Sequence, residues 1–94
     1  MIIFDDRLDF HEFGLITPEQ VAFYLDQFLE NAYAVKHIKV LVITGSGKNS
    51  PGGQGTVKKT VAWQLKHHKL IKSFKPASSS DGGLGAFEVY IKDC

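Results

Sequence analysis

Val40-Leu41-Val42-Ile43-Thr44-Gly45-Ser46-Gly47 is an apolar run that passes directly into a glycine-rich turn. Its first four residues are apolar and mostly β-branched, which predicts a strand well inside a sheet. Glycines at the end of such a strand allow backbone N–H groups to converge on an anion. The stretch therefore predicts an α/β domain with a phosphate-binding turn at the end of a central strand.

A second informative stretch, Leu8-Asp9-Phe10-His11, lies some thirty residues earlier. Leu8 and Phe10 alternate with polar residues, so the tetrapeptide is interpreted as a strand. Side chains change face at each step of a strand, which would place Asp9 and His11 on the same face. A carboxylate beside an imidazole can orient the ring and raise its basicity, as acid–base catalysis requires.

The segments around these stretches complete the predicted fold. Thr17-Pro18-Glu19-Gln20 has the pattern of a capping box and predicts a helix that runs to about Ala34. A second helix is expected to begin near Thr56, which could cap it, and Ile71 to Lys75 is expected to be a short strand. Alternation in 87–91 predicts a half-exposed last strand. The fold class is therefore α/β, a two-layer sandwich in βαβαββ order with a mixed four-stranded sheet, and residues 1–94 form one domain.

The net charge of +1 conceals a strong segregation of charge. Seven acids and a single arginine precede residue 31, whereas residues 31–80 contain nine lysines and no acid. Lysines lie on both sides of the glycine-rich turn, so a nucleic acid or another polyanion is the favoured partner of this basic region. A solvated helix face is the simpler alternative.

Several classes of protein are excluded or disfavoured. The turn is not a nucleotide-binding P-loop, because Val42 occupies the position of its first glycine and Asn49 that of its Ser or Thr. The single cysteine, Cys94, allows no disulfide within the chain and suits a reducing cytoplasm, where we expect the protein to act. No run is long enough to span a membrane. Carboxylates and histidines near the predicted site are too few for a hydrolytic metal centre, so neither metal nor cofactor is expected.

Taken together, the motifs at Leu8–His11, Thr17–Gln20, Val42–Gly47 and Asp81–Ala86 resemble the Smr (small MutS-related) domain, in the same order and over nearly the whole chain. The resemblance implies an α/β sandwich similar to the C-terminal domain of translation initiation factor three. It also implies nuclease activity, since some members nick DNA and others cut RNA, including messenger RNA on stalled ribosomes.

The family's Leu-Asp-x-His motif falls on Leu8 to His11, which implies Asp9 and His11 as catalytic residues. Its second motif, in the Thr-Gly-x-Gly form, falls on Thr44 to Gly47, and we add Thr44 to the candidate catalytic residues. The family usually has glycine directly after the motif histidine, whereas here Glu12 and Phe13 precede Gly14. The loop after the first strand is therefore longer than the family's.

The sequence thus predicts a monomeric, metal-independent RNA endonuclease that uses His11 as its general base. The residues expected to bind the substrate phosphate are Gly45, Ser46, Gly47, Lys48, Lys58 and Lys59. Three alternatives stay open: a metal-assisted DNA-nicking enzyme with Asp9 as a ligand, a non-catalytic adaptor that binds nucleic acid or the ribosome, and a protein-interaction module whose basic face meets an acidic partner.

Overall fold

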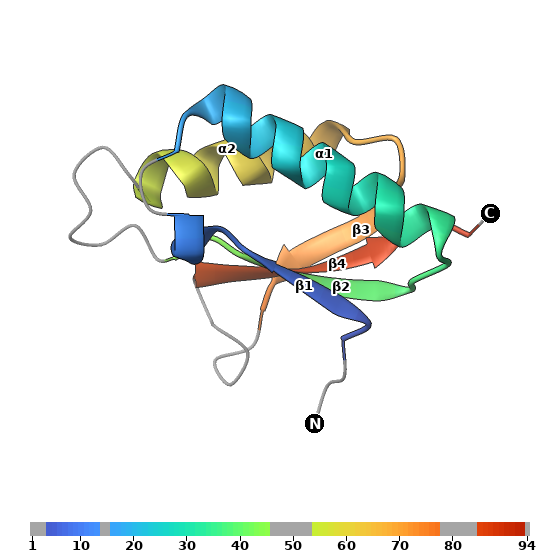
Figure 1. Cartoon of the computed structure of the whole chain (residues 1–94). Coiled ribbons are helices and arrows are strands. Elements are labelled where there is room, and N and C mark those ends of the chain that lie inside the picture. Colours follow the sequence, from blue (N-terminus) through green and yellow to red (C-terminus); the bar gives the residue numbers. More distant parts are fainter. Residues whose placement is uncertain (1–3, 14–15, 46–53, 78–84, 94) are drawn as a thin grey trace.

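The computed structural model describes residues 4–13, 16–45, 54–77 and 85–93 (Figure 1). Its elements follow the predicted order, with one additional 3-10 helix, η1, after the first strand. The elements are β1 (Asp6–Asp9), η1 (Phe10–Phe13), α1 (Pro18–Ala34), β2 (Lys39–Ile43), α2 (Gln54–His67), β3 (Ile71–Pro76) and β4 (Ala86–Ile91). Within the described ranges, no helix is both long and apolar enough to cross a membrane.

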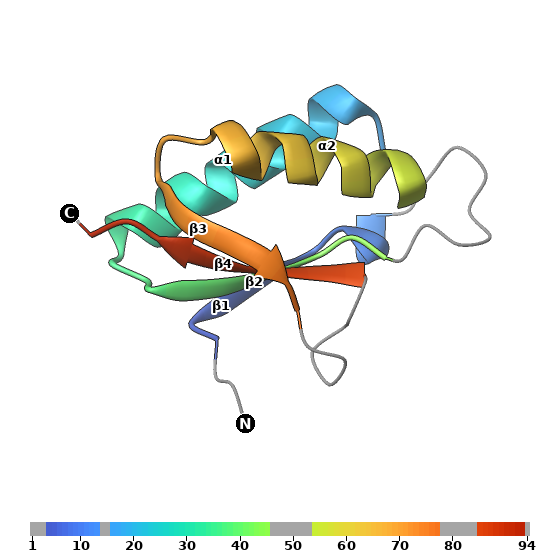
Figure 2. The same cartoon turned by 180° about the vertical axis from the view of Figure 1, so that it is seen from behind.

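The sheet has four strands in the order β1-β2-β4-β3. β1 runs parallel to β2, whereas β4 is antiparallel to both β2 and β3, so the sheet is mixed as predicted. Both helices cover the same face of this sheet, as two opposite views show (Figures 1 and 2). The predicted two-layer α/β sandwich is therefore confirmed.

Helix α1 begins where the capping box predicts. The Gln20 backbone N–H donates to Thr17 Oγ1 at 3.2 Å, and the Thr17 N–H donates to Gln20 Oε1 at 3.0 Å. These two bonds satisfy backbone groups that have no partner inside the helix. The helix ends at Ala34 as expected, and Lys36 follows in the left-handed region with φ of 63°.

The second helix begins earlier than predicted. α2 starts at Gln54, so Thr56 lies inside the helix and is not its N-cap. α2 packs on α1, and Gln64 Nε2 in α2 donates to the Ala22 carbonyl in α1 at 2.9 Å. Directly after α2, His68 Nε2 lies 2.8 Å from Asp26 Oδ1. The hydrogen bond from His68 lowers the pKa of the Asp26 carboxyl.

The main core fills the space between the helices and the sheet. Leu8, in β1, packs against it as a partly buried residue. The buried residues of this core include Phe10, Val21, Leu25, Leu29, Val40, Val42, Val57, Val61, Phe87 and Val89. Leu8 and Phe10 therefore point inward toward the face of α1 that carries Val21 and Leu25, as their alternation with polar residues indicates.

The prediction of a half-exposed last strand is wrong. β4 is central in the sheet, and its residues from Ala86 to Val89 are all buried. The helix-free face of the sheet carries a second apolar cluster, in which Phe4 and Ile43 pack against Leu41, Ala77 and Ala86. Alternation of residue type predicted correctly which side chains share each face of β4, but this second cluster packs over part of the face that was expected to be exposed.

Candidate functional site

The two sequence motifs meet at one edge of the sheet. β1 and β2 are parallel neighbours whose last paired residues are Asp9 and Ile43, so Asp9 lies next to the strand end that leads into Thr44. Adjacent strands lie about 4.8 Å apart, which places the two backbones within one strand spacing. Figure 1 shows η1, the end of β2, the start of α2 and the start of β4 at this same edge. This end of the sheet, where β1 and β2 have their last residues, is called the motif edge below; the term does not refer to an edge strand.

The tetrapeptide Leu8–His11 is not a continuous strand. β1 ends at Asp9, and Phe10 begins the 3-10 helix that includes the backbone of His11. β1 has no partner beyond Ile43, so the ladder stops and the chain turns. The turn places Phe10 in the core with no exposed surface, and the centroid of its ring lies 5.6 Å from that of the Phe13 ring in an edge-to-face arrangement.

This geometry corrects the predicted arrangement of Asp9 and His11. The two residues do not share a strand face, because only Asp9 belongs to the strand. The helix η1 nevertheless lies against β2, so the backbone of His11 remains beside the strand that leads to Thr44. The side chain of His11 lies outside the described part of the structure. Asp9 is half-buried and points to the helix-free face of the sheet, together with its partner Ile43.

Thr44 is fully buried, and its bonds fix the start of the turn. Its hydroxyl lies 3.0 Å from the Gly45 carbonyl and 3.3 Å from the Gly85 carbonyl, to which it can donate its proton. The Gly85 carbonyl also accepts the N–H groups of Thr44, at 2.7 Å, and Gly45, at 3.0 Å. Gly45 has φ of 83°, a conformation that favours glycine. Thr44 thus ties the end of β2 to the start of β4.

Gly85 is a site-forming residue that the motif analysis did not include among the candidates. Its carbonyl holds the backbone of both Thr44 and Gly45, although it lies forty residues further along the chain. The available signal was its position directly before the β4 pattern, at the end of the Asp81–Ala86 block. Nothing local in the sequence pairs that position with Thr44.

The predicted phosphate-binding residues are only partly described. Gly45 is placed as above, whereas Ser46, Gly47 and Lys48 lie outside the described residues. Lys58 is half-buried and Lys59 is exposed, both in the first half of α2, whose N-terminus is at the motif edge (Figure 1). A helix N-terminus and its nearby lysines favour an anion.

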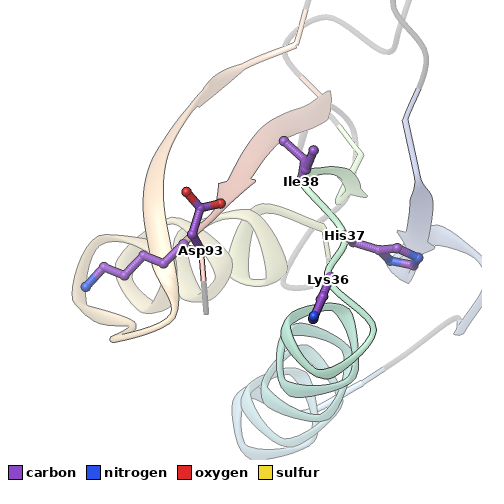
Figure 3. Close-up of a pocket in the computed structure, with 5 residues that line it drawn as sticks. Lys36, His37, Ile38 and Asp93 are labelled. Atoms are coloured by element: carbon purple, nitrogen blue, oxygen red, sulfur yellow. The ribbon is translucent and has the colours of Figure 1, made fainter.

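The opposite end of the sheet contains a shallow cavity (Figure 3). It is lined by Lys36, His37, Ile38, Lys92 and Asp93. His37 is turned away from Asp93 in this view. Close by, the Asp5 carboxylate accepts the N–H groups of Ile38, at 2.7 Å, and Lys39, at 3.1 Å. These two bonds lower the pKa of Asp5.

The described residues contain no group of three or more histidine, cysteine, aspartate or glutamate side chains that could hold a metal ion.

The fold and the motif edge define a class: a two-layer α/β domain in which an Asp-bearing strand end and a Thr-Gly turn are brought together by parallel pairing. The Smr domain family model matches residues 8–92, and the chain belongs to this family.

Relatives and solved structures agree with this assignment. The chain is 33% identical over 89 residues to Endonuclease MutS2 of Carboxydothermus hydrogenoformans, covering 95% of the chain and 10% of that protein. It is 32% identical over 74 residues to Endonuclease MutS2 of Staphylococcus carnosus, covering 79% of the chain and 9% of that protein. The chain thus spans about a tenth of the length of these relatives.

Two solved structures share the fold. The Smr domain of Thermus thermophilus MutS2 superposes with a TM-score of 0.73 at 23% identity, covering 93% of this chain and 96% of that one. YdaL, a stand-alone small MutS-related protein from Escherichia coli, superposes with a TM-score of 0.74 at 25% identity, covering 82% of this chain and 59% of that one.

Proposed function

We propose that this domain is a metal-independent RNA endonuclease whose reaction takes place at the motif edge. The observation that carries the proposal is the parallel pairing of β1 and β2, which puts Asp9 beside the strand that leads into Thr44 and Gly45. Ligands of α/β sheets commonly bind outside the carboxyl ends of parallel strands, and both motifs lie at such ends. The names of the MutS2 relatives, which are endonucleases, support a nuclease activity.

In the proposed reaction, His11 removes the proton of a ribose 2′-hydroxyl, and the 2′-oxygen attacks the adjacent phosphorus. The bond from phosphorus to the 5′-oxygen breaks, and that oxygen leaves with a proton taken from solvent. The products are a 2′,3′-cyclic phosphate and a 5′-hydroxyl. Asp9, at the end of β1 and two residues before His11, would orient the His11 ring.

The phosphate would be held by backbone N–H groups of Gly45 to Gly47, by Lys48 and by the lysines of α2, Lys58 and Lys59. Donors fixed before the reaction stabilise the charge that develops in the transition state. The sequence motif makes Thr44 a candidate catalytic residue, but its burial and its hydrogen bonds to the carbonyls of Gly45 and Gly85 support a positioning role. It would act by holding the turn against β4.

The test compares RNA and DNA substrates for the wild type and two variants. End-labelled RNA and supercoiled plasmid are each incubated with the protein, with and without EDTA. Cleavage of RNA is expected to survive EDTA and to leave 2′,3′-cyclic phosphate ends, and a single 2′-deoxy substitution at the cleavage position should block it. His11→Ala should lower the rate about 10²- to 10⁴-fold, the usual contribution of a general base.

Glu12→Ala is the matched control, because Glu12 is an exposed neighbour in the same 3-10 helix. It should retain activity, and circular dichroism should show both variants folded. Products with 3′-hydroxyl ends, or activity lost completely in EDTA, would replace this mechanism with the metal-assisted nickase. Binding of RNA without cleavage of either substrate would identify a non-catalytic adaptor, and binding of neither nucleic acid would favour a protein-interaction module.

A further inference from the structure

The face of the sheet opposite the helices carries two exposed cations and a buried carboxylate in one row across the strands. Arg7 pairs with Leu41, Leu41 with Glu88, and Glu88 with Lys75, so these four residues lie side by side across all four strands. Arg7 and Lys75 are exposed on the two edge strands, whereas Glu88 between them is buried. No helix in the described residues covers this face (Figures 1 and 2).

The buried carboxylate has a specific role in this arrangement. The Tyr90 hydroxyl donates to Glu88 Oε1 at 3.1 Å, and this bond raises the pKa of Tyr90. Glu88 and Tyr90 are two residues apart on β4, so both point to the helix-free face. A carboxylate with little access to water is costly unless it is hydrogen-bonded, and this bond fixes the Tyr90 ring on the sheet surface.

Aromatic rings and a cation are combined in the next row of the same face. Lys39, the partner of Tyr90, places its Nζ 5.4 Å from the centroid of the Phe4 ring and 5.7 Å from that of Tyr90. Both distances are within the range of cation–π contacts. Phe4, Lys39 and Tyr90 remain partly accessible to solvent. Rings beside cations are the combination with which proteins bind single-stranded nucleic acid.

This face is continuous with the motif edge. Asp9 and Ile43 form the last pair of β1 and β2, and they point to the same side of the sheet as Arg7 and Lys39. Ala86, the partner of Ile43, is four residues from Tyr90 along β4, a distance of about 13 Å at the usual rise per residue. A polynucleotide held at the motif edge could therefore reach Tyr90 within a few nucleotides.

We propose that the helix-free face of the sheet is a track for single-stranded RNA, with Arg7, Lys39 and Lys75 contacting phosphates and the Phe4 and Tyr90 rings contacting bases. The proposal rests on the proposed function for its substrate and adds where the strand flanking the cleaved phosphate lies. Its selectivity follows from the rings, which can stack only on bases that are not paired. Double-stranded RNA offers no such bases.

The test measures binding separately from cleavage, in a His11→Ala background in which the RNA stays intact. A fluorescein-labelled single-stranded RNA oligonucleotide is titrated by fluorescence anisotropy at several salt concentrations. Each phosphate contact on a single strand contributes about 0.7 to the salt slope, so Arg7→Gln with Lys75→Gln should reduce the slope by about 1.4. The control pair Lys66→Gln with Lys69→Gln changes exposed lysines away from this face and should leave the slope unchanged.

The contribution of the ring is tested in the same assay. Tyr90→Ala should weaken binding at least about 5-fold, the lower end of the effect of losing one stacking contact. Tyr90→Phe keeps the ring and should bind within about twofold of the background protein. The same RNA annealed to its complement should bind more weakly than the single strand.

The outcomes separate the two proposals. An unchanged salt slope in Arg7→Gln with Lys75→Gln, while RNA is still bound and the otherwise wild-type protein still cleaves it, would overturn the track and leave the proposed function standing. Loss of binding in these variants, in a protein that cleaves no RNA, would support the track and overturn the nuclease. Equal binding of single and double strands would also overturn the track, and no binding of RNA at all would overturn both.

Discussion

At the scale of single residues, the structure shows two carboxylates that hold other groups in place by accepting hydrogen bonds. Asp5 precedes β1, and its carboxylate bonds to the amides of Ile38 and Lys39 at the start of β2. Glu88 holds a side chain in a similar way, because its carboxylate accepts a hydrogen bond from the Tyr90 hydroxyl. In sequence both acids look like ordinary surface charges. The role of Asp5 depends on partners that the pairing of β1 with β2 brings close, whereas Tyr90 lies two residues from Glu88 on the same strand. Residue type alone indicates neither role.

The pKa of Asp5 yields a prediction of pH-dependent stability. Its pKa is lowered from the ordinary value of 3.8, because the carboxylate accepts two backbone hydrogen bonds. A lowered pKa means that ionised Asp5 stabilises the folded state above about pH 3.8 and that this stabilisation is lost as the pH falls through the lowered value. Asp5→Ala should therefore reduce the free energy of unfolding by about 1 kcal/mol near pH 7, allowing for exposure.

Urea unfolding followed by circular dichroism measures this effect. The difference between wild type and Asp5→Ala should shrink as the pH is lowered below about 3.8. Asp6→Ala is the control, since the Asp6 carboxylate accepts the N–H of the next residue, Arg7, at 2.8 Å. A difference that does not depend on pH would show that the carboxylate charge is not the stabilising feature.

At the scale of elements, the sequence patterns predicted correctly the features that depend on residues close together in the chain. The capping box fixed the start of α1, because both of its bonds join residues three apart in sequence. The end of β1 was predicted wrongly, because the strand stops where its partner β2 stops, which is information from a distant segment. The burial of β4 was missed for the same kind of reason, since Leu41 and Ala77 come from other parts of the chain.

The capping box can be tested on its own. Thr17→Ala removes the side chain that accepts the Gln20 N–H and should lower the free energy of unfolding by about 1 kcal/mol. Thr17→Ser keeps the hydroxyl and should remain close to wild type. The double variant Thr17→Ala with Gln20→Ala should cost less than the sum of the two single variants, because the bonds are reciprocal. Strict additivity in urea titrations would mean that the two side chains act independently.

At the scale of the whole molecule, the fold converts two motifs far apart in sequence into one edge. The predicted order of strand, helix and strand is the usual arrangement of two parallel strands joined by a helix, and β1, α1 and β2 form such a unit. The fold and the neighbourhood of Asp9 and Thr44 were therefore predictable. The contact of Gly85 with the turn was not, because the antiparallel return of β4 fixes it only in three dimensions.

The predicted phosphate patch gives a prediction at this scale. If Lys58 and Lys59 contact the substrate, their replacement by alanine should reduce the salt slope of RNA binding by up to about 1.4, from about 0.7 per contact. Lys66→Ala with Lys69→Ala, in the last turn of α2 and just beyond it, is the matched control and should leave the slope unchanged. Slopes are read from anisotropy titrations of the His11→Ala protein. An equal slope in both double variants would place the phosphates elsewhere.

The position of β1 at the edge of the sheet affects how easily the domain opens locally. In the described residues β1 is one of the two edge strands and, with four residues against six in β3, the shorter one, so local opening can release it at low cost. Each such opening separates Asp9 from the Thr44–Gly45 turn. It therefore disrupts the proposed active site without unfolding the central strands. A phosphate bound across the two strand ends favours the form in which β1 is paired with β2, since binding to that form alone stabilises it by mass action. Bound RNA would therefore keep β1 paired with β2 and hold the two parts of the proposed active site together.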